Sequence, residues 1–156
     1  MRPEPRLFLD TSALFAGIWS AEGGARMLLK LGEAGVVELL VSPQVLGEIE
    51  DVLRRKAPQL VSSLAVLLDR SQAKVERTAP DEVMDRCRKL VPHPGDACIL
   101  ADAWSSQTDF LATLDKEHFL TVRGLAEQVP FRIGTPGDCL AWIREMLSES
   151  GDPKQD

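Results

Sequence analysis

The sequence has no tyrosine or asparagine, and only three tryptophans and three cysteines. The cysteines, Cys87, Cys98 and Cys139, are odd in number and widely spaced, so they form neither a disulfide framework nor a CxxC zinc motif. The few aromatic residues limit stacking on nucleic-acid bases. No apolar run approaches the ~18 residues of a membrane-spanning helix, and the N-terminus lacks a signal peptide. We therefore expect a cytoplasmic protein without a membrane partner.

An excess of positive charge is also missing, because the formal net charge is -6. Proteins that bind nucleic acids usually carry extra lysine and arginine for the phosphates. Two bound divalent cations would change -6 to -2, so the charge does not exclude such a ligand. The length of 156 residues fits one globular domain, predicted over 1–147, with a disordered tail over 148–156.

Short β-branched or aromatic runs alternate with helical patterns, which is typical of a parallel sheet wrapped by helices. The predicted strands are Arg6–Asp10, Val36–Val41, Lys74–Arg77, Asp109–Ala112 and Phe131–Ile133. The predicted helices cover Gly23–Glu33, a segment that starts at Pro43 with Ser42 as N-cap, Leu60–Leu68, Pro80–Leu90, Asp96–Ser106 and a segment that starts at Pro136. The expected fold is a three-layer α/β/α domain with four to five short parallel strands.

Two acids follow predicted strands. Asp10 ends the first strand, and Asp115 follows the fourth, two residues after Thr113. Ligands of such sheets bind beyond the carboxyl ends of the strands, where Thr11 and Ser12 would also face. Taken alone, Asp115 is equally compatible with a turn.

Further acids lie on predicted helices. Glu48 and Glu50 each lie roughly 100° from the apolar stripe centred near Ile49, and we prefer Glu48 because it is nearer the helix start. Asp96 begins a helix and faces inward, although an N-cap worth ~1 kcal/mol is an equally simple role. Asp102 falls on the opposite face and is predicted to be a solvated charge.

Acids that gather at one sheet edge would repel each other unless some are protonated or a cation neutralises them. Mg²⁺ and Mn²⁺ prefer oxygen ligands, whereas zinc usually recruits histidine or cysteine. The spacing of His93 and His118 does not predict a zinc pair. The sequence therefore favours one or two Mg²⁺ or Mn²⁺ ions.

Four segments carry a family resemblance that covers nearly the whole chain. They are Phe8–Leu14 (FLDTSAL), Val41–Ile49 (VSPQVLGEI), Gly95–Ala103 (GDACILADA) and Leu111–Phe119 (LATLDKEHF). In order and spacing the sequence resembles PIN-domain ribonucleases, including toxins of bacterial and archaeal toxin–antitoxin modules.

The resemblance implies that the family's catalytic, metal-binding acids are Asp10, Glu48, Asp96 and Asp115, which favours Glu48 over Glu50. It implies that hydroxyls at Thr11, Ser12 and Thr113 hold the acids or a metal-bound water. Two departures bear on metal affinity and substrate choice. Family members commonly have asparagine where Ser12 stands, and many in the nearest branch have an acid at His93.

The function that the resemblance implies is Mg²⁺- or Mn²⁺-dependent endoribonuclease activity on RNA phosphodiester bonds, as the toxin of a toxin–antitoxin module. Its expected partners are a small antitoxin protein and a second copy in a homodimer. Candidate RNA phosphate contacts, each also compatible with an ordinary solvated face, are Arg54, Arg55, Lys56, Lys116 and Arg123.

Other classes fit less well. A dehalogenase-type phosphatase needs a second acid two residues after its nucleophile, and Ser12 occupies that position after Asp10. Dinucleotide-binding enzymes and P-loop proteins need glycine-rich motifs that are missing here. A non-catalytic PIN-fold protein that binds RNA or acts as a scaffold stays open as an alternative.

Overall fold

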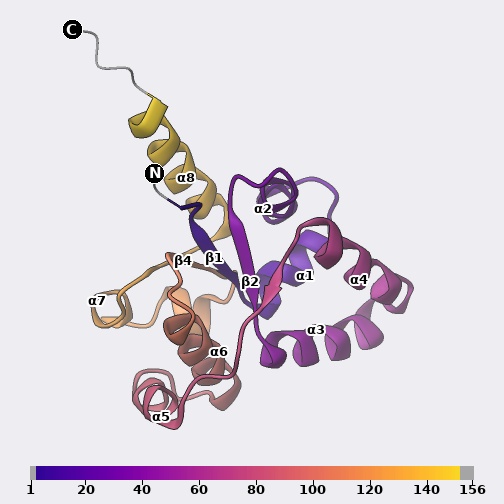
Figure 1. Cartoon of the computed structure of the whole chain (residues 1–156). Coiled ribbons are helices and arrows are strands. Elements are labelled where there is room, and N and C mark those ends of the chain that lie inside the picture. Colours follow the sequence, from indigo (N-terminus) through magenta and orange to yellow (C-terminus); the bar gives the residue numbers. More distant parts are fainter. Residues whose placement is uncertain (1–2, 152–156) are drawn as a thin grey trace, which may run out of the picture.

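The computed structural model describes residues 3–151, and within them five parallel strands form one sheet in the order β3-β2-β1-β4-β5 (Figure 1). The strands are β1 (Arg6–Leu9), β2 (Glu38–Val41), β3 (Lys74–Val75), β4 (Phe110–Ala112) and β5 (Arg132–Gly134). All five predicted strands are present, with ends that differ by a residue or two. The predicted α/β class is confirmed.

Helices cover both faces of the sheet. They are α1 (Thr11–Trp19), α2 (Gly24–Glu33), α3 (Pro43–Lys56), α4 (Val61–Arg70), α5 (Asp81–Leu90), α6 (Pro94–Ser105), α7 (Leu125–Gln128) and α8 (Pro136–Gly151), with short turns η1 (Pro58–Leu60) and η2 (Lys116–Leu120). The connections through α1 to α4 cross the sheet in one direction and those through α5 to α7 in the other. Right-handed crossovers therefore place the two groups on opposite sides, as Figure 1 shows. Helix α8 packs against α2, β4 and β5.

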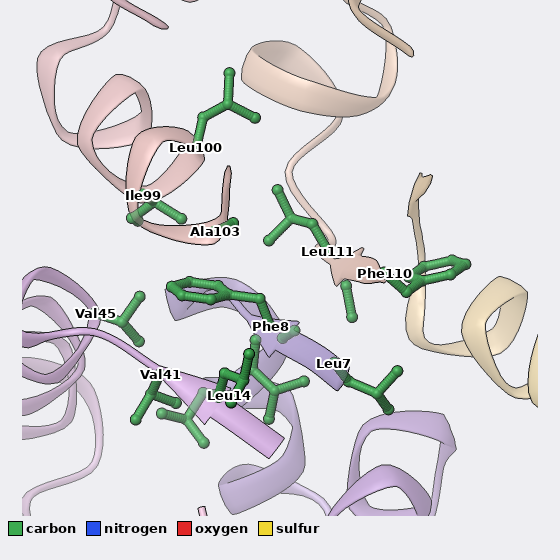
Figure 2. Close-up of a cluster of buried hydrophobic side chains, with 14 of the residues drawn as sticks. Leu7, Phe8, Leu14, Val41, Val45, Ile99, Leu100, Ala103, Phe110 and Leu111 are labelled. Atoms are coloured by element: carbon green, nitrogen blue, oxygen red, sulfur yellow. The ribbon is translucent and has the colours of Figure 1, made fainter. Parts of the chain in front are cut away.

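The central strand β1 is buried on both faces, which explains its continuous apolar run. Leu7 pairs with Leu39 of β2 and with Phe110 of β4. Figure 2 shows the Phe8 ring beside Ile99 and Ala103 of α6. This packing fixes the point at which β1 ends and Asp10 begins the next turn.

Helix α1 was not predicted. Asp10 is its N-cap and accepts a hydrogen bond from the Ala13 backbone N–H at 2.9 Å. Its sequence, TSALFAGIW, is apolar on most sides, so no stripe distinguishes it from a loop or a strand. Gly17 lets α2 approach closely, because a Cβ there would lie 3.1 Å from Leu29 Cδ1.

Asp102 corrects a sequence prediction, because it is buried and only 1% exposed. Its Oδ1 accepts a hydrogen bond from the Ala79 N–H at 2.7 Å, and burial raises the pKa of its carboxyl. Ala79, in the segment between β3 and α5, and Ser42, the N-cap of α3, lie against the side of α6 that was expected to face solvent. The role of Asp102 in the fold is to satisfy a buried backbone donor.

The C-terminal helix α8, at 16 residues, continues to Gly151. It thus passes Ser148, where the disordered tail was expected to begin, and residues 152–156 lie outside the described residues. Among the described residues, none of the helices has the length and apolar character needed to cross a bilayer.

Candidate active site

Four acids line one pocket of about 290 Å³ at the carboxyl edge of the sheet. Asp10 follows β1, Glu48 lies on α3, Asp96 lies in the first turn of α6, and Asp115 follows β4. The remaining lining residues are Thr11, Ser12, Phe15, Val52, Lys56 and Ile99. The structure thus brings together the four acids that the sequence singled out.

Asp10 is the most enclosed of the four acids, at 3% exposed. Its Oδ1 accepts hydrogen bonds from Ser12 Oγ at 2.7 Å and from the Ala13 N–H at 2.9 Å, and its Oδ2 accepts one from the Thr113 hydroxyl. Burial raises its pKa to about 6, because the loss of water outweighs these hydrogen bonds, and the charge of Asp115 adds to the effect. At neutral pH the Asp10 carboxylate is therefore an anion that a nearby cation would stabilise.

The three hydroxyl residues each contact an acid. Ser12 Oγ, besides its bond to Asp10, accepts from the Leu114 N–H at 2.9 Å. Thr113 Oγ1 donates to Asp10 and accepts from the Asp115 N–H at 3.0 Å, so it links the two strand-end acids. Thr11 Oγ1 donates to Glu48 Oε1 at 3.0 Å.

Glu48, unlike Glu50, faces the pocket. Its Oε2 accepts from Gln44 Nε2 at 2.6 Å, and the start of α6 lies against it. A Cβ at Gly95 would lie 3.2 Å from Glu48 Oε2, so a glycine permits this approach. Glu50 is exposed and pairs with Arg54 at 2.5 Å.

Asp96 lies at the third position of α6 and is 8% exposed. The alternative role as N-cap is wrong, because His93 caps the helix: its Nδ1 accepts from the Asp96 N–H at 3.3 Å. Asp96 Oδ2 lies 3.2 Å from His93 Nδ1 and 2.9 Å from His118 Nδ1. Burial raises the pKa of the Asp96 carboxyl.

Asp115 caps the short π-helical turn η2, since its Oδ1 accepts from the His118 N–H at 3.0 Å. Its Oδ2 lies 2.9 Å from His118 Nδ1, and this hydrogen bond raises the pKa of His118. The rings of His93 and His118 lie side by side, with centroids 4.8 Å apart. The fold therefore brings together two histidines whose spacing in the sequence predicted no zinc pair.

Of the five basic residues predicted to contact RNA phosphates, one is in the lining of the pocket. Lys56 lines the pocket, with its Nζ 6.0 Å from the centroid of the Phe15 ring. Arg54 is engaged by Glu50, and Arg55, Lys116 and Arg123 are exposed. Phe15 in turn stacks on Trp19 of α1 at 5.8 Å. Phe15 was missed because α1 was missed.

A five-stranded parallel sheet with acids gathered beyond its carboxyl edge defines an α/β protein with a candidate ligand site at the place where such sheets bind their ligands. The sequence model of the PIN domain matches residues 6–117, so the chain belongs to the PIN domain family. A comparison with curated proteins found no match.

Solved structures share this fold. VapBC2 from Rickettsia felis, bound to a DNA fragment from its promoter, gives a TM-score of 0.64 at 17% identity, covering 83% of this chain and 98% of that one. DNA-bound VapBC from Salmonella typhimurium gives a TM-score of 0.63 at 16% identity, covering 85% of this chain and 98% of that one. VapC20 from Mycobacterium tuberculosis is a toxin that cleaves the sarcin–ricin loop. It gives a TM-score of 0.55 at 18% identity, covering 80% of this chain and 99% of that one.

Proposed function

We propose that this chain is a Mg²⁺- or Mn²⁺-dependent endoribonuclease and the toxin of a toxin–antitoxin module. The gathering of Asp10, Glu48, Asp96 and Asp115 from four separate segments around one pocket carries the proposal. Membership of the PIN domain family and the likeness to VapC20, which cleaves the sarcin–ricin loop, support RNA as the substrate. We further propose that residues 1–147 act as one nuclease domain in the cytoplasm.

The donor set fits a divalent cation. Burial raises the pKa of Asp10 to about 6, so its charge at neutral pH calls for a neighbouring positive charge. The pocket offers carboxylate and hydroxyl oxygens, the ligand type that Mg²⁺ and Mn²⁺ prefer. Asp10, Asp96 and Asp115 would hold one or two ions. When bound, such an ion supplies a water of lowered pKa and an electrophilic partner for the phosphate.

Side chains around the pocket orient the acids that would act in the reaction. The Ser12 and Thr113 hydroxyls hold Asp10 in one orientation. Glu48, oriented by Thr11 and Gln44, serves as a further ligand or as the base that accepts the proton of the attacking water. Water forms a bond to phosphorus and loses a proton, the bond from phosphorus to the leaving oxygen breaks, and the leaving oxygen takes up a proton from solvent.

The proposed partners of this chain are RNA, a small antitoxin protein and a second copy of the chain. Lys56 is the basic residue in contact with the pocket and is proposed to contact a phosphate, with Arg54, Arg55, Lys116 and Arg123 as outer contacts. From the resemblance to toxins of toxin–antitoxin modules, we propose a small antitoxin protein as a partner and a homodimer as the assembly.

The proposal predicts that the purified chain cleaves RNA with Mn²⁺ or Mg²⁺ and stops when EDTA removes the ion. Glu48→Gln should lower the cleavage rate about a hundredfold or more, because the amide neither ligates well nor accepts a proton. Gel analysis of a labelled RNA with time gives the rate.

Glu50→Gln is the matched control, since it makes the same change on the same helix at an exposed position. Its rate should stay close to that of the wild type. Equal rates for the two variants would remove Glu48 from the mechanism. Metal binding without cleavage of any RNA would favour the non-catalytic alternative.

A further inference from the structure

Two acids of the pocket, Asp96 and Asp115, also belong to a cluster that contains a nitrogen donor, His118. Asp96, Asp115 and His118 place three potential ligand atoms within 4.8 Å of one another. His118 Nδ1 lies 2.9 Å from Asp96 Oδ2 and 2.9 Å from Asp115 Oδ2. Adjacent ligands on an ion held at about 2.1 Å are separated by a similar distance of about 3 Å.

We propose that His118 is a metal ligand alongside Asp96 and Asp115, and that this cluster selects a first-row transition ion over Mg²⁺. The inference rests on the proposed metal-dependent function and specifies its ion. Imidazole nitrogen suits borderline ions such as Zn²⁺, whereas Mg²⁺ favours oxygen ligands and retained waters. One imidazole among carboxylates therefore favours a first-row transition ion over Mg²⁺.

The η2 turn and the start of α6 hold His118 at this point. The η2 turn carries it, and Asp115 caps that turn through the His118 N–H at 3.0 Å. The ring of His93, the N-cap of α6, lies beside the His118 ring at a tilt, with the two centroids 4.8 Å apart. The Nδ1 of His93 already accepts from the Asp96 N–H, so His93 is a positioning residue that restricts the neighbouring ring. On metal binding, the proton on His118 Nδ1 passes to solvent and the neutral ring ligates.

His118 is 32% exposed through its side chain, so substitutions there leave the buried core intact. His118→Ala removes the ligand. His118→Gln keeps a side-chain donor that can hydrogen-bond to a carboxylate but lacks the imidazole nitrogen, so it separates ligation from structural support. Glu117→Gln, at the exposed neighbouring residue, is the matched control.

The test is a titration of the metal-free protein with Co²⁺, followed by visible absorption, and with Mg²⁺, followed by its competition against Co²⁺. We expect wild type and Glu117→Gln to bind Co²⁺ more tightly than Mg²⁺. Both His118 variants should lose about tenfold or more in Co²⁺ affinity, a typical cost of disturbing a metal site, and should change less in Mg²⁺ affinity.

Unchanged or tighter Co²⁺ binding by His118→Ala, or an equal loss for both ions, would overturn the inference. So would a His118→Gln variant that binds Co²⁺ as the wild type does. If RNA cleavage still depended on a metal ion in that case, the proposed function would stand without His118 as a ligand. A wild type that bound neither ion and cut no RNA would overturn both.

Discussion

Asp10→Asn is expected to abolish RNA cleavage, with a rate loss of roughly a thousandfold. Asn cannot supply the negative charge that Asp10 contributes from its 3% exposed position between Ser12 and Thr113. The same change should stabilise the metal-free protein at pH 7.5, because it removes a buried charge whose pKa is raised to about 6. The shift corresponds to an upper limit of about 3 kcal/mol. Timed RNA cleavage and urea unfolding measure the two effects.

Opposite effects on activity and stability separate this variant from one that merely unfolds. Asp51→Asn, the same substitution at an exposed position of α3, is the control and should change neither quantity. An Asp10→Asn variant that cut RNA at the wild-type rate would remove Asp10 from catalysis. A strongly destabilised variant would show that the carboxylate serves the fold through its cap on α1.

The apparent affinity for a divalent cation is expected to fall about tenfold or more between pH 7 and pH 5. Below pH 6 a proton occupies Asp10 and competes with the ion, and a group of pKa about 6 gives this factor by itself. The raised pKa values of Asp96 and His118 act in the same direction. Calorimetric titration with Mn²⁺ at both pH values measures the change.

The free energy of unfolding of the metal-free protein should instead fall as the pH rises from 5 to 7.5. A carboxyl whose folded pKa is raised favours the folded state below its unfolded pKa of about 3.8, and the contribution is lost as the pH rises through about 6. The metal-free protein should therefore be more stable at pH 5 than at pH 7.5, and Asp10→Asn should flatten the difference. An Mn²⁺ affinity that is independent of pH would contradict the assignment of Asp10 as a ligand.

Local patterns in the sequence were sufficient to predict the strands and the strand-end acids. An apolar run that ends in Asp10 marks the end of a buried strand, because the next polar group must leave the core. Ser42 and Pro43 start α3 as predicted, with Ser42 Oγ accepting from the Val45 N–H at 3.3 Å. Such signals involve only neighbours in the chain.

Helix α1 and the environment of Asp102 could not be predicted in this way. Both depend on which elements cover a helix, and that is settled by tertiary packing. The apolar stripe of α6 indicated one buried face, but Ala79 and Ser42 lie against the other, so Asp102 is enclosed as well. Glu48 and Glu50 are equivalent in their angle around the helix, so only the nearness of Glu48 to the helix start favoured it, and the family resemblance resolved the tie.

The histidine pair shows the same limit at the site. His93 and His118 lie in separate segments, and their spacing in the chain carries no metal-binding pattern. They meet because α6 begins beside the η2 turn at the carboxyl edge of the sheet. The resemblance offered one signal, since it implies that many family members carry an acid where His93 stands.

Anomalous X-ray diffraction from crystals soaked in millimolar Mn²⁺ tests most directly whether the four acids form a cation site. We predict a strong anomalous peak in the pocket between the carboxylates of Asp10, Glu48, Asp96 and Asp115. An ordered pocket without a peak, in a protein that binds Mn²⁺ elsewhere or not at all, would contradict the account.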